Sequence, residues 1–359
     1  MRSLVDSSTT CQGGVLWKGS VQSFCLRRTS NCAKLKDELD SGSYKKKPAT
    51  RFVLRERGCE RSISGVSFRD RVVQRTLCDS SLVPLLCHGI IDDNCASIKG
   101  RGMHRARIRF AKQMIAAQKR WGGDAVCVQY DFRHYFASID SRRASECVLR
   151  EYMRAATDGN RADARRIHAV ADQIITEERG VGLGNQTSQT VAIWWASPID
   201  HYVREVLRCG LSGRYMDDGY VFCRSSEAAS VLESVRVKAA GLGLELHPRK
   251  SRITPLSKPL AFLKVVYRMD GGHVRVSMCS KSLCRTMRHL AHVRHLVDAG
   301  RMPEEDYVQS LASTYGNICR LASPKQRRRF EASVPGKYAD VLELERIRAL
   351  NGVSLSKSR

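Results

Sequence analysis

The stretch from Arg214 to Phe222 constrains the fold of this chain more than any other. Apolar and aromatic residues flank two adjacent carboxylates, Asp217 and Asp218, and Gly219 follows at once. This order is typical of a short β-hairpin with the acidic pair at its tip. Adjacent carboxylates repel one another unless a cation neutralises them, and magnesium prefers carboxylate and phosphate oxygens. The alternative is a solvated Asp-Asp-Gly turn, and the choice between the two depends on the other motifs of the chain.

The charge of the chain points to a polyanionic partner. Its 359 residues carry 61 Lys and Arg against 36 Asp and Glu, a formal net charge of +25. Such a positive electrostatic field attracts polyanions, and nucleic acid is the first candidate among them. The weaker alternative is a basic protein whose charge serves only its solubility. The hydrophobic fraction of 42% is ordinary for a folded protein, so we expect packed domains rather than disorder.

The cysteines and the hydropathy indicate a cytoplasmic protein. Fourteen cysteines are scattered singly and form no Cys-x-x-Cys pair. We therefore interpret them as buried thiols in a reducing compartment, neither zinc ligands nor a disulfide framework. No stretch approaches a membrane span and the N-terminus lacks the apolar core of a signal peptide, so no membrane partner is expected.

Residues 125–131, Ala-Val-Cys-Val-Gln-Tyr-Asp, predict a buried strand that ends in a carboxylate. A free carboxylate at that position is costly unless it is paired or bound to a metal, which makes Asp131 a candidate ligand. Three aromatic residues follow directly: Phe132, Tyr135 and Phe136. A helical pattern then begins after Ser141.

Two glycine-containing loops are candidate contacts for phosphates. Residues 180–189 form a Gly-rich loop that feeds a helix running to Tyr202, with Thr187 or Ser188 as the expected N-cap. Residues 98–106 place two glycines among cations, which lets a backbone approach a phosphate closely. A plain connector and a solvated basic loop are the respective alternatives.

The remaining elements follow from periodicity. We expect residues 1–48 to be a loosely attached basic extension with a short helix near residues 32–39. Strand-like alternation covers residues 51–55 and 61–66 around a turn at Gly58, and helical spacing covers residues 68–77 and 225–240. A short strand is expected at residues 261–266. The last ninety residues read as helical, with basic faces.

The order of these features indicates a chemistry. Asp131 ends a strand, a Gly-rich loop opens a helix, and Asp217 and Asp218 lie at a hairpin tip. Two metal ions between such carboxylates can activate a primer 3′-hydroxyl and stabilise departing pyrophosphate during in-line nucleotidyl transfer. Each motif alone is a weak signal, but the three in this order are a strong one.

At this point the chain resembles the reverse transcriptases, from about residue 48 to residue 267. Asp131-Phe132-x-x-Tyr135-Phe136 is similar to the first catalytic motif of the family, and Tyr215-Met216-Asp217-Asp218 to its signature hairpin. The resemblance implies that Asp131 and Asp217 are catalytic metal ligands, with Phe132 and Asp218 beside them. It also implies that Phe136 is the bulky gate that selects deoxynucleotides, although an ordinary core aromatic is the alternative.

The resemblance implies further site residues. Lys250, in Leu-His-Pro-Arg-Lys-Ser, resembles the lysine that protonates leaving pyrophosphate. The residues implied to bind the nucleotide are Arg61, Phe136, Leu183, Gly184 and Asn185. Those implied to bind template or primer are Lys99, Arg101, Arg105, Gln189 and the primer-grip turn Phe262-Leu263-Lys264.

Three motifs most resemble the enzymes of diversity-generating retroelements and related phage and bacterial reverse transcriptases. They are residues 185–189, 68–74 and 99–106. Gly182 departs from the usual proline. Leu183 stands where many reverse transcriptases have glutamine, and an aliphatic residue there is linked to error-prone copying. The alternatives are a phage-defence reverse transcriptase and a non-catalytic RNA-binding module; Asp131, Asp217 and Lys250 argue against the module.

The resemblance implies an α/β right-hand polymerase with an antiparallel palm sheet backed by helices. The implied ranges are the extension at 1–48, fingers at 49–124, palm at 125–267, and a helical thumb with a basic tail at 268–359. The implied cofactor is Mg²⁺, as two ions, with Mn²⁺ as a possible substitute. The implied partners are an RNA template, a DNA or RNA primer, deoxynucleoside triphosphates, and a small basic accessory protein or a structured non-coding RNA.

Overall fold

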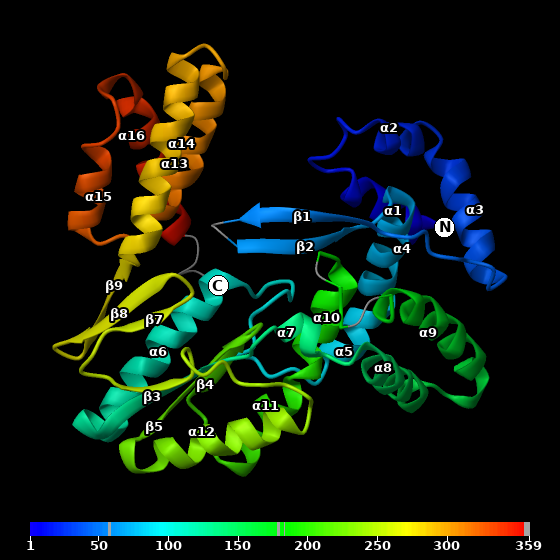
Figure 1. Cartoon of the computed structure of the whole chain (residues 1–359), viewed down its shortest axis with the longest axis horizontal. Helices are drawn as coiled ribbons and strands as arrows, with labels where there is room; N and C mark the ends of the chain where they lie inside the picture. Colours follow the sequence, from blue (N-terminus) through cyan, green and yellow to red (C-terminus); the bar gives the residue numbers. More distant parts are fainter. Residues whose placement is uncertain (57–58, 178–179, 183, 355–359) are drawn as a thin grey trace. The chain divides into compact units, whose positions relative to one another are not determined.

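The computed structural model describes residues 1–56, 59–177, 180–182 and 184–354, and it combines helices with antiparallel β-sheets (Figure 1). The predicted α/β class is confirmed at that level. The chain divides into two compact units, one of residues 1–106 and 128–253, the other of residues 107–127 and 254–359. No helix in the described residues combines the length and apolarity that a membrane span requires.

The first unit holds most of a four-stranded sheet with the order β4-β5-β3-β6. Its strands are β3 (Ala125–Asp131), β4 (Ser212–Tyr215), β5 (Asp218–Arg224) and β6 (Arg252–Pro255). All seven residues of β3 are buried, as expected for a central strand that other elements cover on both faces. The predicted strand at residues 125–131 is confirmed.

The first unit also contains several helices that follow β3. They include α7 (Tyr135–Ser138), α8 (Ser141–Ala155), α9 (Arg161–Ile175), α10 (Gln186–Trp195), α11 (Ser197–His201) and α12 (Ser225–Ala240). The helix predicted at residues 225–240 is confirmed. The helix predicted to run to Tyr202 instead breaks into α10 and α11, because Pro198 starts a new helical turn.

The start of α10 corrects one prediction. The N-cap is Asn185, whose side-chain oxygen accepts a hydrogen bond of 2.7 Å from the backbone N–H of Ser188. Thr187 and Ser188 lie inside the first turn, where both are buried. Ser and Thr are good caps in general, but Asn is at least as good, and the sequence offered all three within four residues.

Residues 1–48 are not loosely attached, as we had expected. They form α1 (Arg2–Cys11), α2 (Gly19–Leu26) and α3 (Arg28–Asp40), which pack around α4 (Phe68–Leu77) (Figure 1). The buried residues of this cluster are Leu4, Cys11, Val21, Cys32, Leu35, Tyr44, Phe68, Val72 and Val73. A shared apolar core of this size makes the N-terminal helices part of the first unit.

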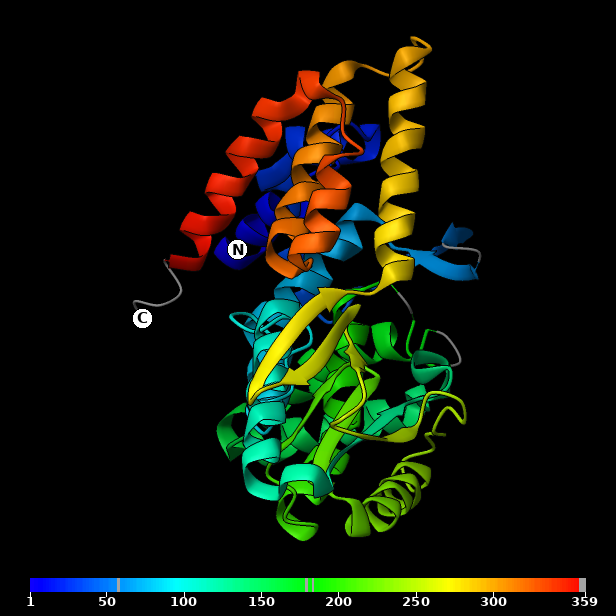
Figure 2. The ribbon, with the colours of Figure 1, turned by 90° about the vertical axis from the view of Figure 1, so that its left-hand side faces the viewer.

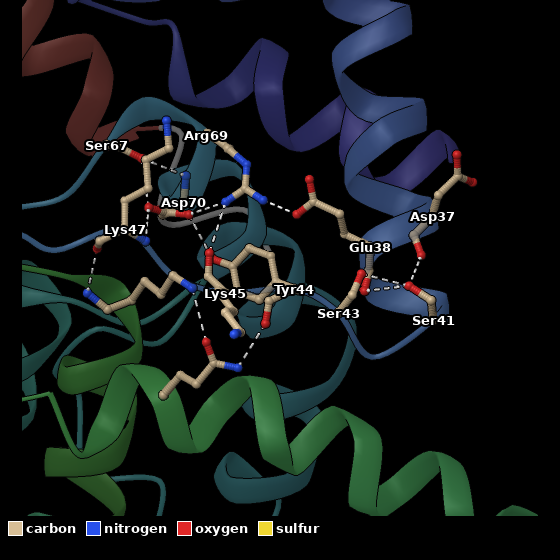
Figure 3. Close-up of polar contacts among 12 residues, drawn as sticks. Asp37, Glu38, Ser41, Ser43, Tyr44, Lys45, Lys47, Ser67, Arg69 and Asp70 are labelled. Carbon is tan, nitrogen blue, oxygen red and sulfur yellow. Dashed lines mark hydrogen bonds and ion pairs between the residues drawn. The ribbon is translucent and has the colours of Figure 1, made fainter.

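A buried carboxylate ties this region together (Figure 3). Asp70 is fully buried and accepts a 2.8 Å hydrogen bond from the Tyr44 hydroxyl. The Lys47 backbone N–H, the Ser67 hydroxyl and the Arg69 guanidinium also donate to it, at 3.0, 2.7 and 2.9 Å. Burial, followed by the charge of Asp70, raises the pKa of Tyr44, so its hydroxyl stays protonated as a donor.

The segment after α3 is held against α9 as well. The Lys46 backbone N–H donates to the Gln173 side chain at 3.0 Å, and the Gln173 amide donates to the Tyr44 carbonyl at 3.1 Å. The Lys46 ammonium forms an ion pair with Glu177. Residues 44–46 therefore form a strap between the N-terminal helices and α9.

The predicted strand pair near the N-terminus is confirmed. Strands β1 (Thr50–Glu56) and β2 (Cys59–Gly65) are antiparallel, with Thr50 opposite Gly65 and Leu54 opposite Arg61. The turn predicted at Gly58 lies outside the described residues. After α4 the chain continues through η1 (Cys78–Leu82) and α5 (Val83–Cys87).

The second unit contains a three-stranded antiparallel sheet and a group of helices (Figure 2). The strands are β7 (Leu260–Phe262), β8 (Val265–Asp270) and β9 (His273–Met278). The helices are most of α6 (Met103–Trp121), then α13 (Ser280–Asp298), α14 (Glu304–Leu321), α15 (Pro324–Glu331) and α16 (Ala339–Ser354).

Two predictions in this unit were wrong. The single strand expected at residues 261–266 is interrupted, because Leu263 and Lys264 both have positive φ and turn the chain from β7 into β8. Strand β9 lies in a stretch that we expected to be helical. The helical character predicted for the last ninety residues is confirmed in α13, whose Leu283, Leu290 and Val293 are buried in the helical core.

Candidate functional site

Asp131 ends β3 and is almost completely buried, with 5% exposure. Its backbone carbonyl accepts a 2.7 Å hydrogen bond from His247, which anchors the segment that carries Lys250. The Lys250 ammonium lies 3.0 and 2.9 Å from the two carboxylate oxygens of Asp131. Sequence analysis named both residues, and the structure brings them together across more than a hundred residues of chain.

The acidic hairpin forms as predicted. Tyr215 is paired with Asp218, so Met216 and Asp217 make a two-residue turn between β4 and β5. Met216 has φ of +59°, the left-handed conformation that such tight hairpin turns require. Asp217 therefore lies in the turn itself, and Asp218 is the first residue of β5.

Gly219 is needed for close contact between β5 and β3. A Cβ atom at Gly219 would lie 2.1 Å from Cζ of Tyr130, the residue before Asp131. No side chain other than hydrogen fits that space, so glycine lets the hairpin tip approach the end of β3. This contact explains why glycine follows the acidic pair.

The three carboxylates interact electrostatically. Burial, the charge of Asp217, and a hydrogen bond and charge from Asp131 together raise the pKa of Asp218 to about 7. Burial raises the pKa of Asp217 as well, and the charge of Asp131 adds to it. The single ammonium group of Lys250 acts in the opposite direction on both. The charge of Arg214 also lowers the pKa of Asp217, but these cations only partly compensate the carboxylates, since both pKa values remain raised.

Lys250 remains protonated in this setting. Burial acts to lower its pKa, but the hydrogen bond to Asp131 and the negative charges of the carboxylates outweigh that effect. The pKa of Lys250 therefore lies above its usual value. The side chain is 57% exposed, so the ammonium reaches solvent as well as Asp131. This arrangement can hold a proton at the edge of the acidic cluster.

Arg214 supports the hairpin from beneath, a role that sequence analysis missed. It is 1% exposed, and its guanidinium donates to Asp200 at 2.8 and 2.7 Å and to the Met216 carbonyl at 2.8 Å. A buried charge must be paired, and here the pair also fixes the turn that carries Asp217. The available signal was a lone arginine at the start of an otherwise apolar hairpin.

The aromatic residues after Asp131 separate into core and surface. Tyr135 is buried, and its hydroxyl donates to the Ala192 carbonyl. Phe132 is buried and stacks on Tyr135, with ring centroids 5.2 Å apart. Phe136 is only half-buried and meets Tyr135 edge-on at 5.7 Å. His134 has φ of +49°, and that turn of the backbone leads into α7.

The Gly-rich loop lies directly against α7. The Val181 N–H donates to the Phe136 carbonyl at 2.9 Å. A Cβ at Gly180, which has φ of +89°, would lie 2.8 Å from the Phe136 carbonyl oxygen. The structure thus brings the loop and Phe136 together. Gly184 has φ of +119° and is exposed, whereas Leu183 lies outside the described residues.

The basic loop near residue 100 is partly used for structure. Arg101 donates to the carbonyls of Ile91 and Asn94, at 2.8 and 3.0 Å, and to Asp92. Arg105 lies 3.8 Å from the same Asp92 carboxylate. Lys99 is exposed. Of the three cations predicted to contact nucleic acid, Arg101 also stabilises its own loop.

Other predicted residues have structural contacts. Gln189 is exposed and accepts a 3.0 Å hydrogen bond from the Ser97 hydroxyl. In the second unit, Phe262 is buried and stacks on Phe110 at 4.8 Å. The Leu263 carbonyl accepts a 2.8 Å hydrogen bond from Arg107. The turn expected at Phe262-Leu263-Lys264 therefore exists. For Arg61 the structure gives only its backbone place in β2.

No three His, Cys, Asp or Glu side chains in the described ranges are arranged as a ready metal cage. The ammonium of Lys250 contacts both carboxylate oxygens of Asp131 in this arrangement. The described cysteines are free thiols, but the expectation that they are buried holds only in part. Those that are buried are Cys11, Cys32, Cys78, Cys95, Cys127 and Cys223, and the other described cysteines are half-buried.

Comparison with known proteins adds no assignment. No family model matches the chain, and no curated protein matches it significantly.

Proposed function

We propose that the chain is an RNA-directed DNA polymerase with a right-hand polymerase fold. The observation that carries the proposal is the meeting of Asp131, Asp217 and Asp218 at the end of β3 and the tip of the β4–β5 hairpin. These elements are far apart in sequence, and the motifs that they carry are those that resemble the reverse transcriptases.

The donor set fits magnesium. Asp131, Asp217 and Asp218 supply oxygen ligands, and a divalent cation would favour the ionised form of the hairpin pair, whose pKa values are raised by burial and by the charges of neighbouring carboxylates. Phe132 would lie beside these ligands. When bound, two magnesium ions would activate the primer 3′-hydroxyl and stabilise the developing charge on the departing pyrophosphate.

The surrounding residues have consistent roles in this proposal. The protonated Lys250 would donate its proton to pyrophosphate as that group leaves. Phe136, half-buried beside the Gly-rich loop, would limit space near the sugar of the incoming nucleotide. Gly184 and Asn185 would position that nucleotide, with Arg61 on its triphosphate. The nucleic acid would be held mainly through its phosphates.

The test is primer extension on a primed RNA template with magnesium and all four deoxynucleotides. We expect Asp217→Ala to lose roughly a thousandfold in rate, since such a ligand contributes several kcal/mol of charge stabilisation. Asp158→Ala is the matched control, because the Asp158 side chain is 95% exposed. Equal extension by the wild type and Asp217→Ala would contradict the proposal.

We further propose the role of a mutagenic retroelement polymerase, supported by the sequence motifs around Leu183. Sequencing of the extension products tests this role. Errors concentrated at template adenines are the expected result. Errors spread evenly over the four template bases would instead favour the related phage-defence enzymes.

A further inference from the structure

A second concave site lies in the first unit and shares no lining residue with the carboxylate cluster. We call it the α8 pocket and define it by Arg143, Cys147, Arg150, Arg154, Trp194 and Trp195. Its volume is about 290 Å³. Helix α8 supplies one wall, and the end of α10 supplies the other.

The α8 pocket is strongly cationic. Arg143, Arg150 and Arg154 are spaced by seven and four residues, so all three lie on the same face of α8. Glu151 is the one acidic side chain among the lining residues, and it pairs with Arg154 at 3.3 Å. In the described part of the chain, neither Arg143 nor Arg150 has a carboxylate within ion-pair distance. The pocket therefore carries an excess of two positive charges.

The other wall is aromatic. Trp195 is buried and fixed by a 3.1 Å hydrogen bond from its indole N–H to the Leu242 carbonyl. The Arg143 guanidinium lies 5.7 Å from the centre of the Trp195 ring. Trp194 meets Trp195 edge-on at 6.5 Å and remains partly exposed, so an indole surface is available to a ligand.

These features specify the ligand chemistry. Arginine guanidinium groups bind phosphates in a two-point geometry, and indole rings stack on nucleobases whose faces are free. Bases inside a duplex are not free to stack on a side chain. The volume lies at the lower end of that of small-ligand pockets, which suits one nucleotide of a longer strand. An acidic peptide would use the arginines but gain little from the indole.

We propose that the α8 pocket binds an unpaired nucleotide of single-stranded RNA, with phosphates on Arg150 and Arg154 and the base against Trp194. The proposal extends the proposed polymerase function, since it gives the RNA substrate a contact outside the carboxylate cluster. Binding here requires neither magnesium nor nucleotide triphosphates.

The first experiment measures binding of a short fluorescein-labelled oligoadenylate RNA to the full chain over a range of salt concentrations. For Arg150→Gln/Arg154→Gln we expect weaker binding. We also expect a plot of log affinity against log salt that is shallower by about 1.4, because each phosphate contact on a single strand contributes about 0.7.

The matched control is Arg161→Gln/Arg165→Gln on α9. This pair has the same four-residue spacing and the same change of charge, and neither residue lines the α8 pocket. The control is expected to retain the wild-type slope. An equal change in both double variants would show that the charge acts non-specifically and would overturn the proposal.

Trp194→Leu tests the base contact. We expect roughly tenfold weaker binding at an unchanged salt slope, since stacking contributes affinity but no charge. Leucine preserves an apolar side chain where Trp194 packs against Ile90, Ala96 and Ile193. Unchanged affinity of a folded Trp194→Leu protein, together with full competition by inorganic polyphosphate, would reduce the site to a plain anion patch and overturn the proposal.

The two proposals fail separately. Asp217→Ala should bind the oligonucleotide as the wild type does but not extend a primer. Arg150→Gln/Arg154→Gln should still extend a short pre-annealed primer. If no protein extends a primer but the oligonucleotide still binds through Arg150 and Arg154, the polymerase proposal fails and the α8 pocket proposal stands. If the wild type extends a primer but the substitutions in the α8 pocket do not change binding, the pocket proposal fails and the polymerase proposal stands.

Discussion

Two buried carboxylate sites in the first unit differ in how their charge is compensated. Asp70 receives four donors, two of them neutral side-chain hydroxyls and one a guanidinium. At the other site, the ammonium of Lys250 contacts Asp131, but it and the charge of Arg214 leave the pKa values of Asp217 and Asp218 raised. A fully satisfied carboxylate stabilises the fold, whereas a cluster short of cations is suited to bind one. The contrast separates a structural acid from a candidate catalytic one.

The largest effect should be the loss of activity when the carboxylate cluster is neutralised without a change of shape. Asp217→Asn is expected to reduce primer extension by roughly a thousandfold. Its stability should stay equal or rise, because the substitution removes repulsion with Asp131. Thermal unfolding measured beside extension rates checks both. A large fall in stability would make Asp217 resemble Asp70 and would break the comparison.

The same substitution at the structural site should act on stability instead. Asp70→Asn breaks the buried one of the two ion pairs of Arg69 and leaves its partly exposed pair with Glu38, and we expect a loss of about 3–5 kcal/mol in the free energy of unfolding. Denaturant unfolding measures it. Asp37→Asn is the control in the same region, because Asp37 on α3 is exposed (Figure 3). A loss below that of the control would show that Asp70 is not what holds the N-terminal helices.

We expect magnesium to bind at the Asp131, Asp217 and Asp218 cluster and not at Asp70. A metal that binds only the folded state stabilises it by about 2.7 kcal/mol at a hundred times its dissociation constant. We expect wild type and Asp70→Asn to show this gain in a thermal-shift titration, and Asp217→Asn/Asp218→Asn to lose it. An undiminished gain in the latter variant would place the metal elsewhere.

The smallest effect should come from one neutral donor at the structural site. Tyr44→Phe removes the 2.8 Å hydrogen bond to Asp70 while keeping the ring. We expect a loss of about 1–3 kcal/mol, since a buried acceptor loses one of its partners. Urea unfolding beside wild type measures it, and no change would mean that the other three donors suffice.

The sequence predicted the parts of the candidate site that depend on local patterns. The hairpin at Asp217 was predictable because alternation, an acidic pair and glycine lie within nine residues. The strand before Asp131 was predictable from a short, mostly apolar run that only Gln129 interrupts. The meeting of Asp131 with Lys250 came only from resemblance, because no local pattern reports a contact between residues 119 positions apart.

Other features of the structure could not be predicted from local sequence patterns, for identifiable physical reasons. The attachment of the N-terminal helices depends on their apolar contacts with α4 and on Asp70, and both lie well beyond these helices in sequence. The turn between β7 and β8 was expected only from the resemblance, because it contains neither glycine nor proline although Leu263 and Lys264 adopt positive φ. The buried charge of Arg214 is revealed only by its distant partner Asp200. Each of these features depends on tertiary contacts rather than on local propensity.

The contact of Gly219 with Tyr130 has a consequence for the tolerance of the site. The thickness of one phenol ring sets the spacing between the hairpin tip and the end of β3. Any side chain at position 219 would clash with Tyr130 and push Asp218 away from Asp131. The sequence of the acidic residues would not change. A substitution of this glycine alone could therefore abolish the proposed metal chemistry, although the sequence would still contain every acidic residue of the cluster.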